Sequence, residues 1–479
     1  MSLAKIKMRR GAAGEWASSN PILDEGEFGI DTSTGQFRIG NGTSRWAALL
    51  PFYPGVTGGS GGSSSGGGAP LITVASAISS SRVKARADYV CNGTNDADII
   101  NAAILAADNQ INNGNTGPRH GSLQLADGVY VLNKPILIPG RGFSLMGCGF
   151  GTALMKASTF TNGGRGSAEA LIKMANTLPG NQAGCITIKD MFLAGRHRAN
   201  FGAGAPSGTP IKGIHLEITP GDAVAAMSDP TTYGWPTGGP NESDNHSILE
   251  NLRIWDTAGG IFVSDTTGAR GFQYKGIMIG RLTSGAKGLH SNASDSKTFQ
   301  CVVASGGATN ATGIHLDGGN GLMLQCKAFY FNASGSLGFN VSSSRCTLVL
   351  CESQDNLEGF RVTGDNAEAI GCRVDTQVAS TIGFNLNGAS SFNIEGLAIH
   401  TRGPGTLTNG LCLPNATTVG DGKLSAYIDP IVGGGVAKPV TVGPGFTEVV
   451  ASSGIPTGIE ALITVKGKGT LRRELAYTH

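Results

Sequence analysis

A short segment that opens with glycine recurs at nearly regular intervals in this sequence. Residues 312–326 read TGIHLDGGNGLMLQC, and residues 337–351 repeat the pattern as LGFNVSSSRCTLVLC. The glycines that open such segments are Gly260, Gly288, Gly313, Gly338, Gly359, Gly383 and Gly410, and Gly213 opens an earlier one. A repeat of roughly 20–30 residues with strand-like alternation is typical of a solenoid of stacked coils. Because no helical segment recurs in each unit, the pattern predicts a parallel β-helix.

The alternation predicts which side chains each coil buries. Successive side chains of a strand point to opposite faces, so the residues one and three places after each glycine should point inward. These pairs are Ile214/Leu216, Ile261/Val263, Ile314/Leu316, Phe339/Val341, Phe360/Val362 and Phe384/Leu386. The residue in the middle should point outward, which gives the row His215, Phe262, His290, His315, Asn340, Arg361 and Asn385.

A second strand of each coil ends in cysteine. Cys301, Cys326, Cys351 and Cys372 all stand at the same distance after a repeat glycine, and Phe299, Leu324, Val349 and Ile370 stand two places before them. We expect both sets to point inward, with the cysteines stacked along the axis as small apolar filler. A metal or redox array is the alternative, but a dry interior disfavours the thiolate form that such chemistry needs.

Composition and charge argue against several classes of protein. The net charge is +2 and no basic stripe indicates a nucleic-acid partner. No apolar run reaches the roughly 18 residues of a membrane span, and the start, MSLAKIKMRRGAAGEW, lacks the apolar region of a secretory signal. None of the nine cysteines forms a CxxC pair. We therefore expect them to be reduced, which indicates synthesis in a cytosol.

Changes in composition divide the chain into four predicted segments. Residues 56–81 begin with the Gly/Ser-rich string VTGGSGGSSSGGGA, which is typical of a flexible linker. The linker separates a small β-rich module, residues 1–55, from the β-helix, residues 82–417. In residues 418–479 the coil pattern fades, and we expect a β-rich cap that covers the open end or joins several chains.

The N-terminal module carries the marks of a known family. The string RRGAAGEWASSNPILDEGEFGIDTSTGQFRIGNGTSRWAAL combines an RRG…EW start, a strand pair with turns at Thr34-Gly35 and Asn41-Gly42, and a closing Trp. It resembles, over most of residues 9–50, a module common near the N-terminus of bacteriophage tail fibres. The resemblance implies a place in the virion tail, attachment to tail or baseplate proteins through residues 1–55, and a homotrimer made in the host cytoplasm.

The start of the predicted β-helix carries a second resemblance. The string TNDADIINAAILAAD places Ile99, Ile100, Ala103, Ile104 and Ala107 on one helical face, with Asp96 where an N-cap is expected. The strings GSLQLADGVY (121–130) and LMGCGFGTALMK (145–156) follow. This order resembles the opening of pectate-lyase-like proteins. It implies a right-handed parallel β-helix with an N-terminal capping helix, and it covers none of that family's catalytic coils.

Two insertions flank one strand of the β-helix. Residues 195–210 precede strand 211–218 and residues 219–246 follow it. They and the strand carry aromatic and basic residues that suit a sugar, because rings stack on its C–H faces while polar groups bind its hydroxyls. The glycan-binding candidates are Arg196, His197, Arg198, His215, Tyr233 and Trp235. The alternative is that the two aromatic residues hold a long loop in place or fill a subunit contact.

The evidence for catalysis is weaker. Glu217 with Asp244 or Asp265 offers an acid pair of the kind that glycosidases use, but many acids qualify equally well. We find no acidic calcium cluster beside a matching Arg, no G-x-S-x-G string and no P-loop. We predict no metal and no cofactor, and we expect His215, His290 and His315 to be solvated or in a subunit interface.

These features together predict a phage tail fibre or tailspike that binds a host cell-surface polysaccharide. The alternative is a depolymerase, a glycoside hydrolase or polysaccharide lyase, that degrades the same polymer.

Overall fold

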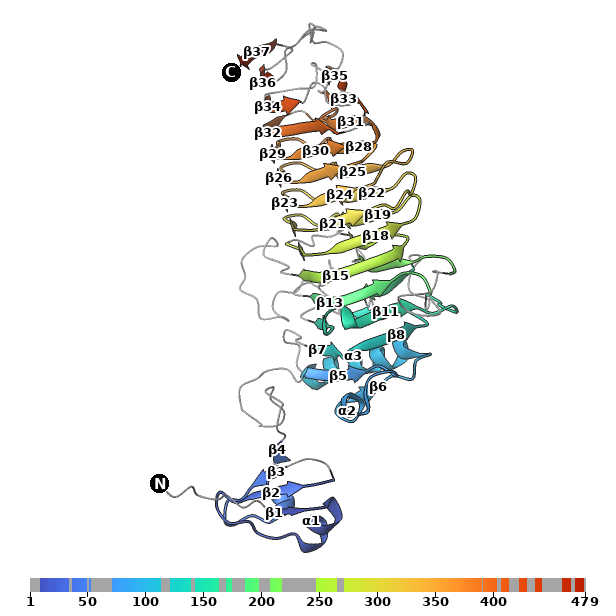
Figure 1. The fold of residues 1–479 in the computed structure, drawn as a ribbon, viewed down its shortest axis with the longest axis vertical. Coiled ribbons are helices and arrows are strands. Elements are labelled where there is room, and N and C mark those ends of the chain that lie inside the picture. The colour runs from blue at the N-terminus through green and yellow to red at the C-terminus, as the bar shows by residue number, and fades with distance from the viewer. Residues whose placement is uncertain are drawn as a thin grey trace. The chain divides into compact units, whose positions relative to one another are not determined.

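The structure is a computed structural model, and it divides the chain into two compact units, Met1–Gly68 and Ala69–His479 (Figure 1). The residues that it describes are 9–33, 37–49, 51–52, 71–112, 121–138, 143–162, 169–174, 186–197, 207–217, 247–264, 271–389, 391–402, 406–412, 422–428, 436–441, 459–466 and 470–477.

The first unit is a four-stranded sheet with one helix. Its elements are β1 (Arg9–Gly11), α1 (Ala13–Ser19), β2 (Phe28–Asp31), β3 (Phe37–Ile39), the 3₁₀ turn η1 (Trp46–Ala48) and β4 (Pro51–Phe52). The predicted strand pair is β2 and β3, which are antiparallel. Trp16 stacks on Trp46 with ring centroids 3.8 Å apart, and both join Leu23 and Leu49 in a small core.

The second unit begins with β5 (Leu71–Ala75), α2 (Ser81–Lys84), β6 (Tyr89–Val90) and α3 (Asp96–Asn112). The first coils contain β7 (Ser122–Leu125), β8 (Gly128–Leu132), β9 (Ile136–Ile138), β10 (Ser144–Met146), η2 (Gly149–Gly151), β11 (Thr152–Lys156), β12 (Ala170–Met174), β13 (Thr187–Ala194), β14 (Lys212–Glu217), β15 (Ile248–Thr257) and β16 (Ile261–Ser264).

From β17 onward the coils are regular and contribute three strands each. These strands are β17 (Gln273–Lys275), β18 (Met278–Leu282), β19 (Lys287–Ser291), β20 (Lys297–Phe299), β21 (Val302–Ala304), β22 (Thr312–Leu316), β23 (Leu322–Leu324), β24 (Lys327–Phe329), β25 (Leu337–Val341), β26 (Thr347–Val349), β27 (Glu352–Gln354), β28 (Glu358–Val362), β29 (Ala367–Ile370), β30 (Arg373–Thr376) and β31 (Ala379–Asn385). The last strands are β32 (Phe392–Thr401), β33 (Thr406–Cys412), β34 (Gly422–Ile428), β35 (Val436–Thr441), β36 (Ile459–Lys466) and β37 (Thr470–Tyr477).

Each strand of a regular coil pairs in parallel with the equivalent strand of the next coil. His290 of β19 pairs with His315 of β22, and His315 pairs with Asn340 of β25, so the register follows the repeat of the sequence. Figure 1 shows these coils stacked along one axis. The predicted fold class, an all-β chain built on a parallel β-helix, is confirmed. The predicted right-handed winding agrees with the general rule that connections between parallel strands are right-handed.

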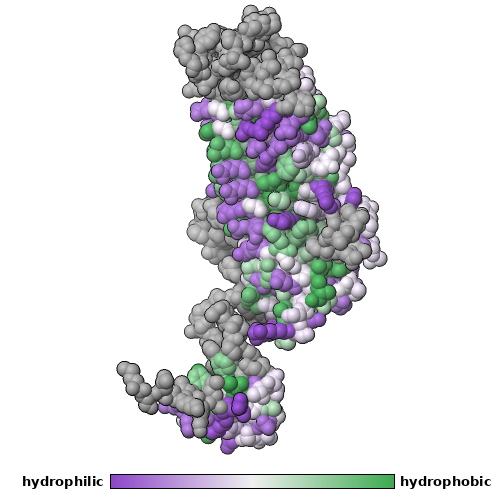
Figure 2. Space-filling view, viewed as in Figure 1, coloured by the Kyte–Doolittle hydropathy of each residue, from purple (hydrophilic) through white to green (hydrophobic). Residues whose placement is uncertain are grey.

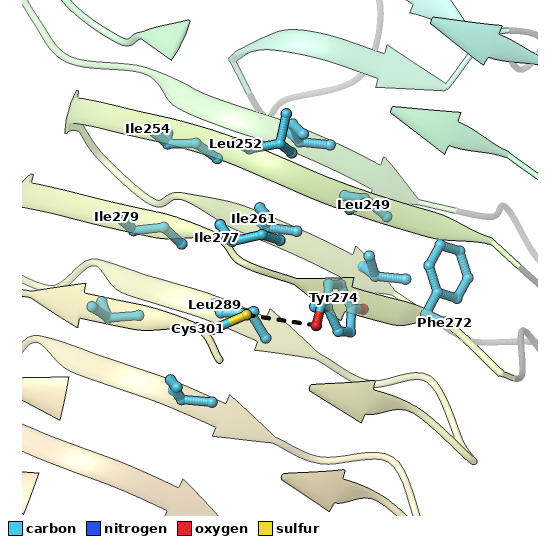
Figure 3. Packing of buried hydrophobic residues seen from close by; sticks show 14 of the residues in the cluster. Leu249, Leu252, Ile254, Ile261, Phe272, Tyr274, Ile277, Ile279, Leu289 and Cys301 are labelled. Carbon is cyan, nitrogen blue, oxygen red and sulfur yellow. Dashed lines mark hydrogen bonds between the residues drawn. The ribbon is translucent and has the colours of Figure 1, made fainter. Parts of the chain in front are cut away.

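One continuous hydrophobic core runs through the second unit. All of the predicted inward pairs lie in it, from Ile214/Leu216 to Phe384/Leu386, and each of these side chains is at most 1% exposed. Phe360 stacks between Phe339 and Phe384, with ring centroids 4.5 and 5.1 Å away. Figure 3 shows the same packing of successive coils around Leu252, Ile277 and Leu289. The apolar layers of neighbouring coils therefore cover one another, as the alternation predicts.

The four cysteines of the second strand also form a buried stack, as predicted. The residues two places before them were predicted wrongly. Phe299, Leu324, Val349 and Ile370 point away from the core, and the residues one place earlier are buried instead: Thr298, Met323, Leu348 and Ala369. The reason is a residue with positive φ immediately before each cysteine, such as Gln300 (φ 52°). This left-handed corner interrupts the period of two, because the alternation of faces holds only in extended backbone.

The predicted capping helix is α3. Its residues Ile100, Ala103, Ile104 and Ala107 belong to the core of the second unit, and Ile99 packs against that core. Asp96, predicted as the N-cap, is the first helical residue, and its carboxylate accepts backbone hydrogen bonds at 2.7 and 2.8 Å from the loop before the helix and from β8. None of the helices in the described part of the chain has the length and apolarity that crossing a membrane requires.

The parallel stacking extends past both predicted limits of the β-helix. Residues 71–75 were placed in the linker, yet they form β5, which pairs with β7 and buries Ile72 and Val74. At the other end, β34 pairs with β32 and β35 with β33, so parallel pairing continues beyond residue 417. The strands beyond residue 417 thus pair in parallel although the sequence repeat that opens with glycine has ended. The antiparallel strands β36 and β37 follow.

Candidate functional site

The predicted outward residues form a row on the 11-stranded sheet, from β14 to β31. The register pairs each of them with the next: His215, Phe262, His290, His315, Asn340, Arg361 and Asn385. We call this set the outer row. None of its members belongs to the hydrophobic core, although His215, His315 and Asn385 are largely buried.

The first four members of the outer row are rings in contact with one another; His215 stacks on Phe262 and His290 on His315, whereas Phe262 and His290 are tilted by 51°. Ring centroids lie 4.8 Å apart for His215 and Phe262, 4.9 Å for Phe262 and His290, and 4.6 Å for His290 and His315. Strands about 4.8 Å apart bring rings at equivalent positions into this contact. Because neighbouring rings lie against one another, the row offers ring edges and polar groups more than open aromatic faces.

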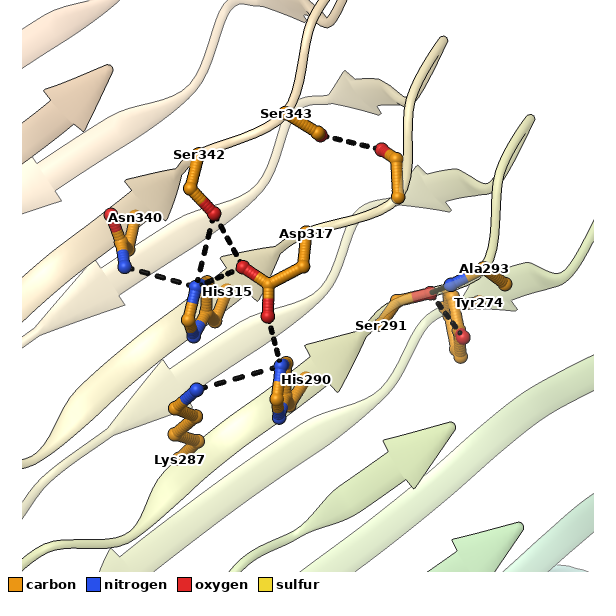
Figure 4. A network of polar contacts seen from close by, with 11 residues as sticks. Tyr274, Lys287, His290, Ser291, Ala293, His315, Asp317, Asn340, Ser342 and Ser343 are labelled. Atoms are coloured by element: carbon orange, nitrogen blue, oxygen red, sulfur yellow. Dashed lines mark hydrogen bonds and ion pairs between the residues drawn. The ribbon is translucent and has the colours of Figure 1, made fainter. Parts of the chain in front are cut away.

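Asp317 connects two of these imidazoles. It lies two residues after His315, on the same side of the chain, and its Oδ1 and Oδ2 lie 2.5 Å from Nε2 of His315 and 2.6 Å from Nε2 of His290. Ser342 donates a hydrogen bond to Oδ1, and Nδ2 of Asn340 lies 3.0 Å from Nε2 of His315 (Figure 4). The carboxylate therefore has three donors, which come from its own coil and from the two neighbouring coils.

The charges of this network are set by burial and by these contacts. Burial alone would raise the pKa of Asp317, but its three hydrogen bonds outweigh that effect and hold the pKa well below its usual range. Burial lowers the pKa of His290, and the nearby Lys287 adds to this shift. Burial also lowers the pKa of Lys287, whose Nζ lies 3.5 Å from Nε2 of His290. Asp317 is thus an anion at neutral pH beside a histidine that is predominantly neutral.

The far end of the outer row carries a second polar cluster. Nε of Arg361 donates to Oε1 of the buried Glu358 at 2.9 Å, and Nδ2 of Asn385 donates to the same oxygen at 2.9 Å. The side chain of Arg361 remains 44% exposed. The first end of the row has a cation as well, because Nζ of Lys212 lies 4.9 Å from the ring centroid of Phe262 and 3.3 Å from Nδ1 of His215. Charged donors therefore flank the stacked rings on both sides.

Only some of the site residues predicted from the sequence fall within the described residues. His215 lies on β14 in the outer row, and Arg196 and His197 follow β13, half-buried. The backbone N–H of Ile211 donates to the carbonyl of Gly195 at 2.9 Å, which brings the two ends of the 195–210 insertion together beside β14. Glu217 ends β14, and its side chain is not described. Arg198, Tyr233, Trp235, Asp244 and Asp265 lie outside the described residues.

The site residues predicted from the sequence did not include Lys287, Asp317 and Ser342. All three stand at fixed offsets from a repeat glycine: Lys287 one place before Gly288, and the other two four places after Gly313 and Gly338. A comparison of equivalent positions in successive repeats would have placed these three residues beside the outer row.

The same cluster contains the ligand types that metals use. Within the described residues, His290, His315 and Asp317 offer two imidazole nitrogens and a carboxylate oxygen that all lie within 4.8 Å of one another. From the sequence, no metal site was predicted, and the histidines were expected to be solvated or in a subunit interface. The structure instead places His290 and His315 in a shared polar network with Asp317.

Comparison with known protein families gives one match. Residues 6–44 match the family described as the major tropism determinant N-terminal domain. This match confirms the predicted resemblance of the N-terminal module to bacteriophage tail fibres. No curated protein matches the sequence.

Several solved structures resemble the chain at low identity. They include ORF18 of Geobacillus virus E2, with 14% identity over 98% of this chain and 90% of that one and a TM-score of 0.42. The A-module of the Azotobacter vinelandii mannuronan C-5 epimerase AlgE4 has 14% identity over 74% and 96%, with a TM-score of 0.37. Tailspike protein 2 of the Escherichia coli O157:H7 bacteriophage CAB120 has 9% identity over 76% and 46%, with a TM-score of 0.40. Similarities this distant carry no argument about activity or substrate.

Proposed function

We propose that the chain is a bacteriophage tail-fibre or tailspike protein that binds a polysaccharide of the host cell surface along the outer row. The N-terminal match supports the place in the virion tail. The observation that carries the binding proposal is the row of outward side chains across successive coils, from His215 to Asn385, in which every member except Phe262 offers a hydrogen-bonding group.

The outer row has the chemistry and the repeat that a polysaccharide requires. Sugars are bound through their many hydroxyls; Lys287 and Asn340 offer donors close to the anionic Asp317, and Arg361 offers a further donor along the row. Adjacent coils are about 4.8 Å apart, so an extended polymer along the axis would meet a new set of polar groups at each coil. The fixed spacing belongs to a rigid sheet, which lowers the entropic cost of binding.

The two insertions beside β14 complete the proposed site. Arg196, His197 and Arg198 come from the first and Tyr233 and Trp235 from the second, and each insertion joins an end of the strand that carries His215. Tyr and Trp would supply the open aromatic faces that the stacked rings of the outer row do not offer.

We further propose that three copies assemble side by side, with residues 1–55 attached to tail or baseplate proteins. An apolar stripe on the wall of the β-helix supports contact between copies. The stripe consists of Phe299, Leu324, Val349 and Ile370, which are register partners on four successive coils, together with Leu350, which is 53% exposed. On the face seen in Figure 2, hydrophobic residues lie among hydrophilic ones along the stack. Burial of the stripe against a second copy would remove this apolar surface from water.

The test measures binding of the purified chain to host capsule and cell-wall polysaccharides. Arg361→Ala and Lys287→Met should each weaken binding about 10-fold or more, since a hydrogen bond to a charged group contributes about 1.5–3 kcal/mol. Lys327→Met is the matched control, because Lys327 lies on β24 in a different sheet. Trp235→Ala tests the inserted loops in the same assay.

The assay also separates the two functions that the sequence left open. Binding without release of sugars supports the receptor-binding proposal. Release of new reducing ends or of unsaturated sugars would show the depolymerase instead. Absence of binding to every host polysaccharide would overturn both, and binding that neither Arg361→Ala nor Lys287→Met weakens would remove the outer row as the site.

A further inference from the structure

We infer that His290, His315 and Asp317 form a binding site for a divalent transition-metal ion of the zinc class on the outer face of the β-helix. The inference does not depend on glycan binding. It rests on three ligand atoms that the fold brings together from two adjacent coils, all within 4.8 Å of one another.

The β-helix itself holds the three side chains in place. His290 and His315 are register partners on β19 and β22, and their rings are stacked 11° from parallel. Asp317 follows His315 by two residues, and its carboxylate faces Nε2 of both rings (Figure 4). The side chains of the two histidines are only 14% and 10% exposed. Their rotamers are therefore fixed by packing before any ion arrives, which lowers the entropic cost of ligation.

The ligand types select the class of ion. Two imidazoles and one carboxylate suit zinc and the neighbouring transition metals, whereas calcium and magnesium prefer oxygen ligands alone. Bonds of about 2.1 Å separate tetrahedral ligands by about 3.4 Å. The carboxylate oxygens now lie 2.5 and 2.6 Å from the imidazole nitrogens, so each contact would lengthen by less than about 1 Å to admit the ion. Three protein ligands leave a further position for water or another oxygen.

The surrounding residues act on the ion in opposite directions. Ser342 donates to Oδ1 of Asp317 and so orients the carboxylate, as outer-shell partners of metal ligands do. Lys287 is a competing cation, because its Nζ lies 3.5 Å from Nε2 of His290. Removal of this charge should strengthen metal binding, which is a consequence that a purely structural hydrogen-bond network does not share.

The test uses the full chain without an affinity tag, stripped with a chelator and titrated with Zn²⁺ by calorimetry. Co²⁺ serves as a second probe, because tetrahedral coordination gives it a visible absorption band. We expect the wild-type chain to bind the ion. His315→Ala and Asp317→Asn should each lower the affinity for it more than about 100-fold, since the loss even of an outer-shell partner costs about 10–100-fold in metal affinity. Lys287→Met should tighten binding several-fold.

His215→Ala is the matched control, because this histidine occupies the same coil position but is separated from His290 by Phe262. It should bind Zn²⁺ as the wild type does. Equal affinity in the wild type, His315→Ala and Asp317→Asn would overturn the inference, as would no binding to the wild type. Circular dichroism confirms folding of each variant, and a gain of affinity in Lys287→Met cannot come from misfolding.

Discussion

His290 and His315 stack with ring centroids 4.6 Å apart, although a full sequence repeat separates them along the chain. The contact exists because one coil of the β-helix equals one sequence repeat, so equivalent positions become neighbours in space. The same relationship lets the carboxylate of Asp317 bridge the Nε2 atoms of the two rings. A substitution in this network therefore acts across two coils at once.

Asp317→Asn should lower thermal stability most near neutral pH. The pKa of Asp317 is held below its usual range, so its stabilising effect is fully present above the unfolded value of about 3.9 and is lost as pH falls toward the folded value. The difference in Tm between the wild type and the variant should thus be present at neutral pH and shrink below pH 4. Melting curves from pH 7 to 2 test this, and a difference that does not shrink contradicts it.

His290→Gln should reduce the loss of stability on mild acidification. Burial lowers the pKa of His290, so the stability associated with its neutral ring is full above about pH 6.5 and falls as pH drops toward the folded pKa. We expect the wild-type Tm to fall between pH 7 and 5 and that of the variant to fall less. An equal fall of Tm in the two chains would contradict this prediction.

Phe360→Ala should destabilise the β-helix by about 3–5 kcal/mol, the usual cost of removing a buried aromatic side chain. Phe360 is fully buried and stacks on both Phe339 and Phe384, so the cavity would weaken two coil interfaces. Phe360→Leu, which leaves a smaller void, should cost clearly less. Urea unfolding followed by circular dichroism measures the difference, and equal effects of the two substitutions would argue against the stack.

The core of the β-helix was predictable because one rule, the period of two after each glycine, governs it in every coil. The rule fails at Phe299, Leu324, Val349 and Ile370, where a left-handed corner precedes the cysteine. The residue type at this corner differs between coils. It is Gln300 and Gln325 in the first two, Leu350 in the third and Gly371 in the fourth. A conformation that several residue types adopt leaves no clear pattern in one sequence.

The polar network was harder to predict than the core. His290 and His315 were recognised as outward residues, but Asp317 gains its role only from the distance between neighbouring coils, which a linear sequence does not display. The loop residues Tyr233 and Trp235 stay a prediction, because they lie outside the described residues. The period of the sequence thus predicts the core positions, which are the same in every coil. A site depends on the positions at which the coils differ.

Leu350→Asn should have opposite effects on the stability of the single chain and on its assembly into a trimer. Leu350 adopts φ 52° and is exposed, and a left-handed residue of this kind costs about 1–2 kcal/mol, less for Asn. The substitution should therefore stabilise the single chain but weaken the proposed trimer, whose apolar stripe it interrupts. Sedimentation velocity and thermal melting measure the two effects. Gln325→Asn, at the equivalent corner of the preceding coil, is the control that should leave assembly unchanged.

Trp16→Ala should unfold the first unit and leave the β-helix intact. Trp16 stacks on Trp46, and its Nε1 donates to the carbonyl of Ile30 at 2.9 Å. Truncation of a buried Trp costs about 3–5 kcal/mol, which a core of this size cannot absorb. Because the chain divides into two compact units, calorimetry should lose one transition and keep that of the β-helix.

If the virion-attachment proposal holds, the variant should still bind polysaccharide but fail to join phage tails. Normal incorporation into tails would show that attachment does not need the folded first unit.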